Sequence, residues 1–91
     1  MQDRVKPSNL PEHLVPIWEE MEGQFAPRIG ALGLESVCAQ VYRMRRARQQ
    51  IDAEGEIVAD ARGNPSPHPA LAVEKQASGE VREWIKRYGV R

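Results

Sequence analysis

Apolar side chains recur at helical spacing in three stretches of the chain. In residues 13–25 they fall on one stripe, at i, i+3, i+4, i+7 and i+11: Leu14, Ile17, Trp18, Met21 and Phe25. This stripe predicts a first helix. Because Pro16 is tolerated only in a first turn, the regular helix is expected to begin near residues 14–15. A stretch rich in proline and glycine follows over residues 27–33 and predicts a bent connector.

The longest helical pattern predicts a second helix over residues 35–54, ended by a glycine at position 55. Its apolar stripe comprises Val37, Val41, Met44 and Ile51, with Cys38 beside it. Residues 56–67 differ, because a short strand-like run is followed by turn residues and prolines. We therefore expect a small β-hairpin-like excursion after the second helix.

A third helix is expected to start at Pro69, where the missing N–H costs no hydrogen bond, and to end at Gly89. The side chain of His68 is expected to cap it. Gly79, in its middle, predicts a bend or a close approach of another segment. The apolar stripe of this helix comprises Ala70, Val73, Ala77, Val81, Trp84 and Tyr88.

These patterns predict a mainly α fold, with three amphipathic helices and a short β-hairpin-like excursion between the second and third. Residues 1–12 show no periodicity and are expected to form a flexible polar arm, whereas residues 13–91 form a single helical domain. A chain of 91 residues buries only about 60–65% of its unfolded surface, so its core is thin. Self-association is one way to cover the remaining apolar surface.

The composition is that of a folded chain, with 41% apolar and 29% charged residues. No apolar run approaches the roughly 20 residues that cross a bilayer, and the single Cys38 suggests a reducing compartment. The net charge is zero, but it is unevenly distributed. Residues 1–25 carry two basic and five acidic side chains (−3). Residues 26–50 carry five basic and one acidic side chain (+4), and residues 51–91 carry six basic and seven acidic side chains (−1). A basic middle suits either a polyanion or the acidic end of a neighbouring copy.

Four arginines lie within two turns of the second predicted helix, and the planar guanidinium group suits phosphate. Arg43 and Arg46 point away from the apolar stripe, so they are the candidates for contact with DNA, and the family resemblance described below favours that role over a solvated face. Arg45 and Arg48 lie on or beside the stripe, where an unpaired charge is costly, so we expect them in ion pairs at a subunit interface. The alternative is a solvated face, with Arg48 paired to Asp52 and Arg45 to a glutamate of a neighbouring subunit.

Two further groups of side chains are candidates for binding. On the polar face of the third helix, Lys75, Arg82 and Lys86 could follow a phosphate backbone. A solvent-facing charged surface diluted by nearby glutamates is the more common explanation of such a row. The aromatic side chains on the apolar stripes favour core or subunit contacts over base stacking. Those assigned to an oligomer interface are Trp18, Trp84 and Tyr88.

Nothing in the sequence indicates catalysis, a metal or a cofactor. His13 and His68 lack further ligands at metal-binding spacing, and no glycine-rich phosphate loop precedes a Lys-Ser/Thr pair. Neighbouring acids such as Glu19 and Glu20 point about 100° apart on a helix and share no site. We therefore expect a protein that is not an enzyme and has no catalytic residues, metal or cofactor.

The order of the parts resembles the small subunit of tailed-phage terminase over about residues 12–90. The resemblance rests on Leu32-Gly33-Leu34 before the long helix, His68-Pro69-Ala70-Leu71 opening the third helix, and Tyr88-Gly89-Val90 ending it. It implies a non-catalytic, ring-forming homo-oligomer in the cytoplasm of the infected bacterial host. Such subunits bind double-stranded phage DNA and regulate the large ATPase/nuclease subunit during genome packaging.

Two other functions would fit the same helices. One is a helical protein–protein interaction module without direct DNA binding, which uses its charges only for subunit contacts. The other is a sequence-specific repressor, but the connector at 27–33 lacks the tight three- to four-residue turn of a helix-turn-helix motif.

Overall fold

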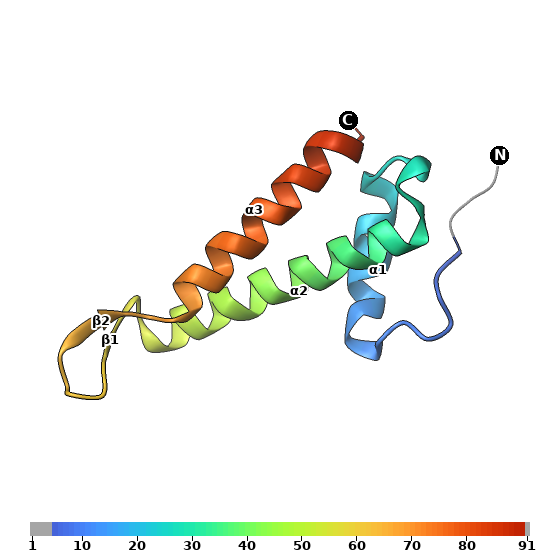
Figure 1. Ribbon diagram of the computed structural model, residues 1–91. Coiled ribbons are helices and arrows are strands. Elements are labelled where there is room, and N and C mark those ends of the chain that lie inside the picture. Colours follow the sequence, from blue (N-terminus) through green and yellow to red (C-terminus); the bar gives the residue numbers. More distant parts are fainter. Residues whose placement is uncertain (1–4, 91) are drawn as a thin grey trace.

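The computed structural model describes residues 5–90, so residues 1–4 of the predicted arm and residue 91 of the predicted domain lie outside the described residues. Figure 1 shows three α-helices and a two-stranded hairpin: α1 (Val15–Met21), α2 (Gly30–Glu54), β1 (Ile57–Ala59), β2 (Pro65–Pro67) and α3 (Ala70–Tyr88). Short 3-10 turns flank α1 and precede α2: Glu12–Leu14, Glu22–Gln24 and Pro27–Ile29. The predicted fold class, three helices with a hairpin between the second and third, is confirmed.

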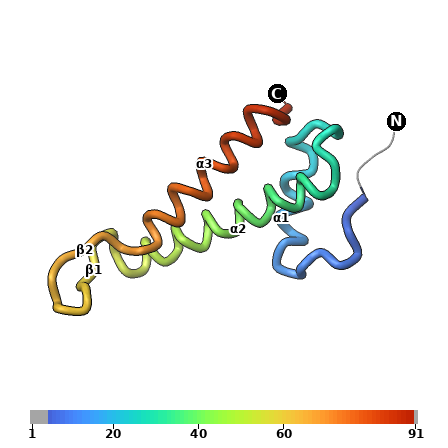
Figure 2. The backbone as a smooth tube through the Cα atoms, viewed as in Figure 1, coloured from blue at the N-terminus to red at the C-terminus, as the bar shows by residue number. Residues whose placement is uncertain are grey.

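The chain is elongated. It measures 58 × 27 × 16 Å and has a radius of gyration of 16.0 Å, against about 12 Å for a compact domain of this length. The two long helices, α2 and α3, lie together at the hairpin end and diverge away from it (Figures 1 and 2). The short helix α1 lies at the open end, against the N-terminal part of α2.

The hydrophobic core sits at this open end. Trp18 of α1 is 1% exposed, and Leu34 and Val37 of α2 are completely buried. Leu10 also belongs to the core, so the segment expected to be a polar arm contributes a buried side chain at that point. The buried apolar side chains at the hairpin end are small: Ala47, Ala70 and Ala77. This end of the helix pair, which we call the distal arm (residues 44–77), therefore has little core of its own.

The first predicted helix is shorter than expected. It begins at Val15, with Pro16 in its first turn as predicted, but it ends at Met21 and gives way to a 3-10 turn. Phe25 then adopts an extended backbone and forms a β-bridge with Gly89 at the end of α3. The sequence pattern could not show this break, because the segment that pairs with Phe25 lies more than 60 residues away.

The end of α3 is fixed to the segment after α1 by several contacts. The Ala26 N–H donates to the Tyr88 carbonyl at 2.7 Å, and Arg28 Nη2 donates to the Arg87 carbonyl, also at 2.7 Å. The Arg28 guanidinium also lies 4.6 Å from the centre of the Tyr88 ring, a cation–π distance. A cation at the last carbonyls of a helix is favourable because those groups carry partial negative charge.

The second helix begins five residues earlier than predicted, at Gly30. Gly33 was interpreted as part of a bent connector, which is wrong, because it lies inside α2. A Cβ at this position would stand 2.9 Å from Ile29 Cγ1 and 3.6 Å from Trp84 Cζ3. The glycine therefore allows close packing of these side chains rather than a break in the helix. At the other end, Gly55 closes α2 with a φ of 90°, as predicted.

Of the two glycines singled out for the third helix, one differs from expectation and the other agrees. Gly79 was expected to mark a bend or a close approach, but α3 runs unbroken through it, and the nearest atom to an added Cβ is Arg82 Nη2 at 3.9 Å. Gly89 follows the last residue of the helix, as predicted, with a φ of −65°. Its requirement is space, because a Cβ there would lie 2.5 Å from the Ile85 carbonyl oxygen.

The hairpin is antiparallel, with Val58 opposite Ser66. Asp60 organises its turn, because its Oδ1 accepts hydrogen bonds from the N–H groups of Arg62 and Asn64, both at 2.9 Å. The predicted capping by His68 is confirmed, since its Nδ1 accepts the Ala70 N–H at 2.9 Å. Its Nε2 lies 2.6 Å from Glu54 Oε1 and so joins the end of α2 to the start of α3.

Candidate nucleic-acid interface

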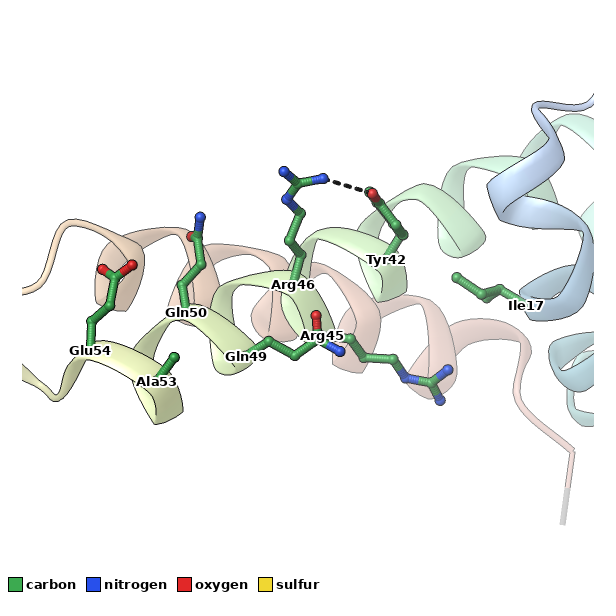
Figure 3. Close-up of a pocket in the computed structure, with 8 residues that line it drawn as sticks. All are labelled: Ile17, Tyr42, Arg45, Arg46, Gln49, Gln50, Ala53 and Glu54. Atoms are coloured by element: carbon green, nitrogen blue, oxygen red, sulfur yellow. Dashed lines mark hydrogen bonds between the residues drawn. The ribbon is translucent and has the colours of Figure 1, made fainter.

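The two arginines expected to contact DNA are exposed on the outer face of α2. Arg46 Nη1 donates to the Tyr42 hydroxyl at 2.9 Å, and Arg43 Nη1 donates to Gln40 Oε1 at 3.5 Å. Both partners are neutral, and neither arginine forms an ion pair within residues 5–90. No acidic side chain of the described residues therefore compensates the charges of Arg43 and Arg46, and Tyr42 restricts the orientation of Arg46 (Figure 3).

Two shallow grooves run along this face of α2. The larger, of about 490 Å³, is lined by Ile17, Tyr42, Arg45, Arg46, Gln49, Gln50, Ala53 and Glu54. The smaller, of about 180 Å³, reaches α3 and is lined by Tyr42, Arg43, Arg46, Ala47, Gln50 and Val73. Three residues, Tyr42, Arg46 and Gln50, line both grooves, and we call them the α2 ridge. They are spaced at i, i+4 and i+8, which places them in one row along the helix.

Arg45 and Arg48 form ion pairs within the chain. Arg45 donates two hydrogen bonds to the carboxylate of Glu20 in α1, at 2.9 and 2.7 Å. This hydrogen bonding lowers the pKa of Glu20 and raises the pKa of Arg45. Arg48 Nε lies 2.9 Å from Glu74 Oε2 on α3, and not beside Asp52. The two pairs join α2 to each of the other helices, whereas an additional role in a subunit interface stays a prediction.

The basic side chains of α3 are exposed, as their positions on the polar face predicted. Lys86 Nζ lies 3.9 Å from Glu83 Oε2, so part of its charge is balanced locally. Lys75 and Arg82 form no ion pair with another described residue. This second surface is less uniformly basic than the one on α2, because Glu80 and Glu83 are exposed among its lysines and arginines.

The aromatic residues assigned to an oligomer interface occupy different environments. Trp18 is a core residue of this chain, and with 1% of its surface exposed its side chain offers no contact to a neighbouring copy. Trp84 and Tyr88 are half-buried, with ring centroids 5.6 Å apart, and they pack against the core. Ile85, beside Trp84, is 51% exposed, and Leu32 is 80% exposed.

Sequence reasoning missed the polar part of the α2 ridge. Gln50 and its neighbour Gln49 are exposed, and their amides have no hydrogen-bond partner in the part of the chain described. The signal was present in the spacing, because Tyr42, Arg46 and Gln50 follow one another at intervals of four. It was overlooked because the charges of the neighbouring arginines dominated the interpretation.

Three other features would point to other functions: a metal site, a reactive thiol and a membrane-spanning helix. Among residues 5–90 no three His, Cys, Asp or Glu side chains converge where they could hold a metal ion. Burial, reinforced by the charges of Glu35 and Glu20, raises the pKa of the Cys38 thiol to about 11, so this thiol is a poor nucleophile. No described helix is long and apolar enough to cross a membrane.

Comparison with known families gives one result. A family described as "Phage terminase, small subunit" matches residues 17–90, which is most of the chain and includes α2, the hairpin, α3 and all but the first two residues of α1. Comparisons with curated proteins and with solved structures give no match.

Proposed function

The chain belongs to the phage terminase small-subunit family, and on that premise we propose that it binds double-stranded phage DNA directly, as a ring-forming oligomer. Terminase small subunits are non-catalytic, and family membership implies a role in DNA packaging. In this proposal the protein works in the cytoplasm of the infected host, where it recognises the genome and regulates the large ATPase/nuclease subunit.

The observation that carries the proposal is the uncompensated charge of Arg43 and Arg46. They lie in the segment that holds a net charge of +4, on an exposed helix face, and their hydrogen-bond partners within residues 5–90 are neutral. Contact between such groups and duplex DNA releases counterions, so affinity falls steeply as salt increases. Lys75, Arg82 and Lys86 on α3 would extend the basic surface.

Self-association is supported by the shape of the chain and by its exposed apolar side chains. The distal arm has little core, and Leu32 and Ile85 are exposed near the half-buried Trp84. Contacts between different surfaces of successive copies generate a closed ring when the rotation between copies closes. We assign four residues to such contacts, Arg45, Arg48, Trp84 and Tyr88, whereas Trp18 belongs to the core of the chain.

The test is a salt titration of binding to a fluorescent duplex, followed by anisotropy. Replacing both Arg43 and Arg46 by alanine is expected to weaken binding and to reduce the slope of log K against log salt by about 2. The matched control, Lys6→Ala with Arg62→Ala, removes the same charge away from α2 and should preserve the slope. If the α2 double substitution left both the affinity and the slope unchanged, Arg43 and Arg46 would not be DNA contacts, and the interaction-module alternative would be favoured.

The native mass, measured with and without the duplex, tests the oligomer separately. We expect a species of several subunits at tens of micromolar. A strict monomer under both conditions would refute the ring while leaving the DNA contact open to the titration above.

A further inference from the structure

The α2 ridge presents two different hydrogen-bonding groups side by side. Arg46 offers the guanidinium donors that its bond to Tyr42 does not use, and Gln50 offers both a donor and an acceptor from an amide without a partner among residues 5–90. Figure 3 shows Tyr42, Arg46 and Gln50 extending to the same side of α2. A neutral amide contributes nothing to counterion release, so the attraction of a polyanion does not account for Gln50.

The spacing of this row matches the spacing of bases in a duplex. Arg46 and Gln50 are four residues apart on one helix, which separates them by about 6 Å along the axis. Two base-pair steps of B-form DNA span about 6.8 Å. Side chains of one helical row can therefore reach bases separated by one intervening pair when the helix lies along the major groove.

The next residue in the row, Glu54, would bring a carboxylate towards the nucleic acid. The side chain of His68 forms a hydrogen bond with this carboxylate. Its Nδ1 accepts the Ala70 N–H, so in the neutral imidazole the proton is on Nε2, which donates to Glu54 Oε1 at 2.6 Å. One oxygen of this carboxylate is thereby engaged by His68, and Arg46 and Gln50 are members of the row that keep unused hydrogen-bond donors.

The surroundings of the ridge favour a duplex over a single strand. Binding of single strands relies on exposed aromatic rings on which bases stack. Tyr42 is half-buried, its hydroxyl accepts from Arg46, and its ring lies 4.4 Å from the His13 ring. Arg43 lies to one side of the ridge, in a position suited to the sugar–phosphate backbone.

We propose that Arg46 and Gln50 read base edges in the major groove of duplex DNA, Arg46 a guanine and Gln50 an adenine about two base pairs away. Arginine matches the O6 and N7 acceptors of guanine, and glutamine matches the N6 donor and N7 acceptor of adenine. Arg43 contacts the backbone. This inference rests on the proposed function, because it assigns specificity to residues within the same DNA-binding face.

The experiment is a selection from a library of duplexes with 20 randomised base pairs, using the full chain. Consensus and scrambled duplexes are then compared at one salt concentration with the wild type, Gln50→Ala and Gln76→Ala. Gln76 is exposed on α3, outside the ridge, and its substitution makes the same chemical change. Both variants place alanine in a helix, which favours folding.

We expect an enriched guanine and adenine separated by one base pair. Gln50→Ala should reduce discrimination at the adenine by about tenfold and keep the preference for guanine, whereas Gln76→Ala should keep both. Salt-dependent binding without any enriched sequence would overturn this inference and leave the proposed function intact. A consensus that Gln50→Ala does not alter would also overturn it, and an absence of all DNA binding would overturn both.

Discussion

Replacing Gly79 or Gly33 by alanine should change stability in opposite directions, although both glycines lie inside long helices. Alanine is favoured over glycine in a helix interior by about 0.5–1 kcal/mol. The main reason is that alanine lowers the conformational entropy of the unfolded chain, so less entropy is lost on folding. At Gly79 an added methyl group meets only the flexible end of Arg82, at 3.9 Å. Gly79→Ala should therefore stabilise the protein by nearly that whole amount.

At Gly33 the same methyl group would stand 2.9 Å from Ile29 Cγ1, in the middle of a side chain that is 9% exposed and packed in the core. Trp84, at 3.6 Å, limits the alternative positions of the added group. Overpacking of this kind costs about 1–3 kcal/mol. After the helical gain is subtracted, the net cost is about 0–2.5 kcal/mol, so Gly33→Ala should destabilise the protein by up to about 2.5 kcal/mol.

Thermal unfolding followed by circular dichroism measures both effects. One kcal/mol corresponds to about 4–8 °C in a domain of this size, so Gly79→Ala should raise Tm by about 2–8 °C and Gly33→Ala should lower it. Protein concentration must be the same throughout, because self-association contributes to the apparent stability. A lower Tm for Gly79→Ala would refute the reasoning, since it would show that another surface occupies the space beside this glycine.

Three further predictions concern single groups. Cys38 should resist a thiol reagent at pH 8 in the folded protein, because a pKa of about 11 leaves about one thousandth of the thiol ionised. It should react when urea unfolds the chain, and a rapid reaction of the folded protein would contradict the burial of this thiol. The Glu20–Arg45 pair lowers the pKa of Glu20, so its stabilisation is complete above pH 4.5 and is lost as pH falls through the lower folded value. Both side chains are 45% exposed, so Glu20→Gln should lower the free energy of unfolding by only a few tenths of a kcal/mol at pH 7 and by nothing in strong acid. Urea unfolding measures this, and an equal loss of stability at both pH values would exclude the ion pair as its cause. In the same assay His68→Ala should lower the free energy of unfolding by about 1–2 kcal/mol, because it removes the acceptor for the Ala70 N–H and the contact with Glu54. His68→Asn should recover part of that loss, and equal losses for the two variants would argue against capping.

The sequence predicted the elements of this fold well where their causes are local. The apolar stripe of α3, the proline after His68 and the glycine at position 55 act within a few residues, and the structure agrees with each. The start of α2 was misplaced because Gly33 has the same local signature whether it breaks a helix or lets Trp84 pack closely. That distinction depends on a residue about 50 positions away.

The ion pairs show the same limit. Local spacing suggested Asp52 as a partner for Arg48 and another subunit for Arg45, but the carboxylates come from α3 and α1 of the same chain. Glu20 and Glu74 lie about 25 residues from the arginines they bind, and only the packing of the helices brings them together. The outward direction of Arg43 and Arg46 followed from helical geometry alone, and the structure places both on an exposed face.

The confinement of bulky buried side chains to one end of the molecule has a consequence for its local opening. Backbone amides around Leu34 and Val37 should exchange with solvent only on global unfolding, whereas those near Ala47 and Ala70 should open first, at a lower free energy. The α2 ridge lies partly on this less protected segment. A ligand that binds the α2 ridge therefore also restrains this segment. Slower deuterium uptake in the segment would then report binding at the ridge without a label.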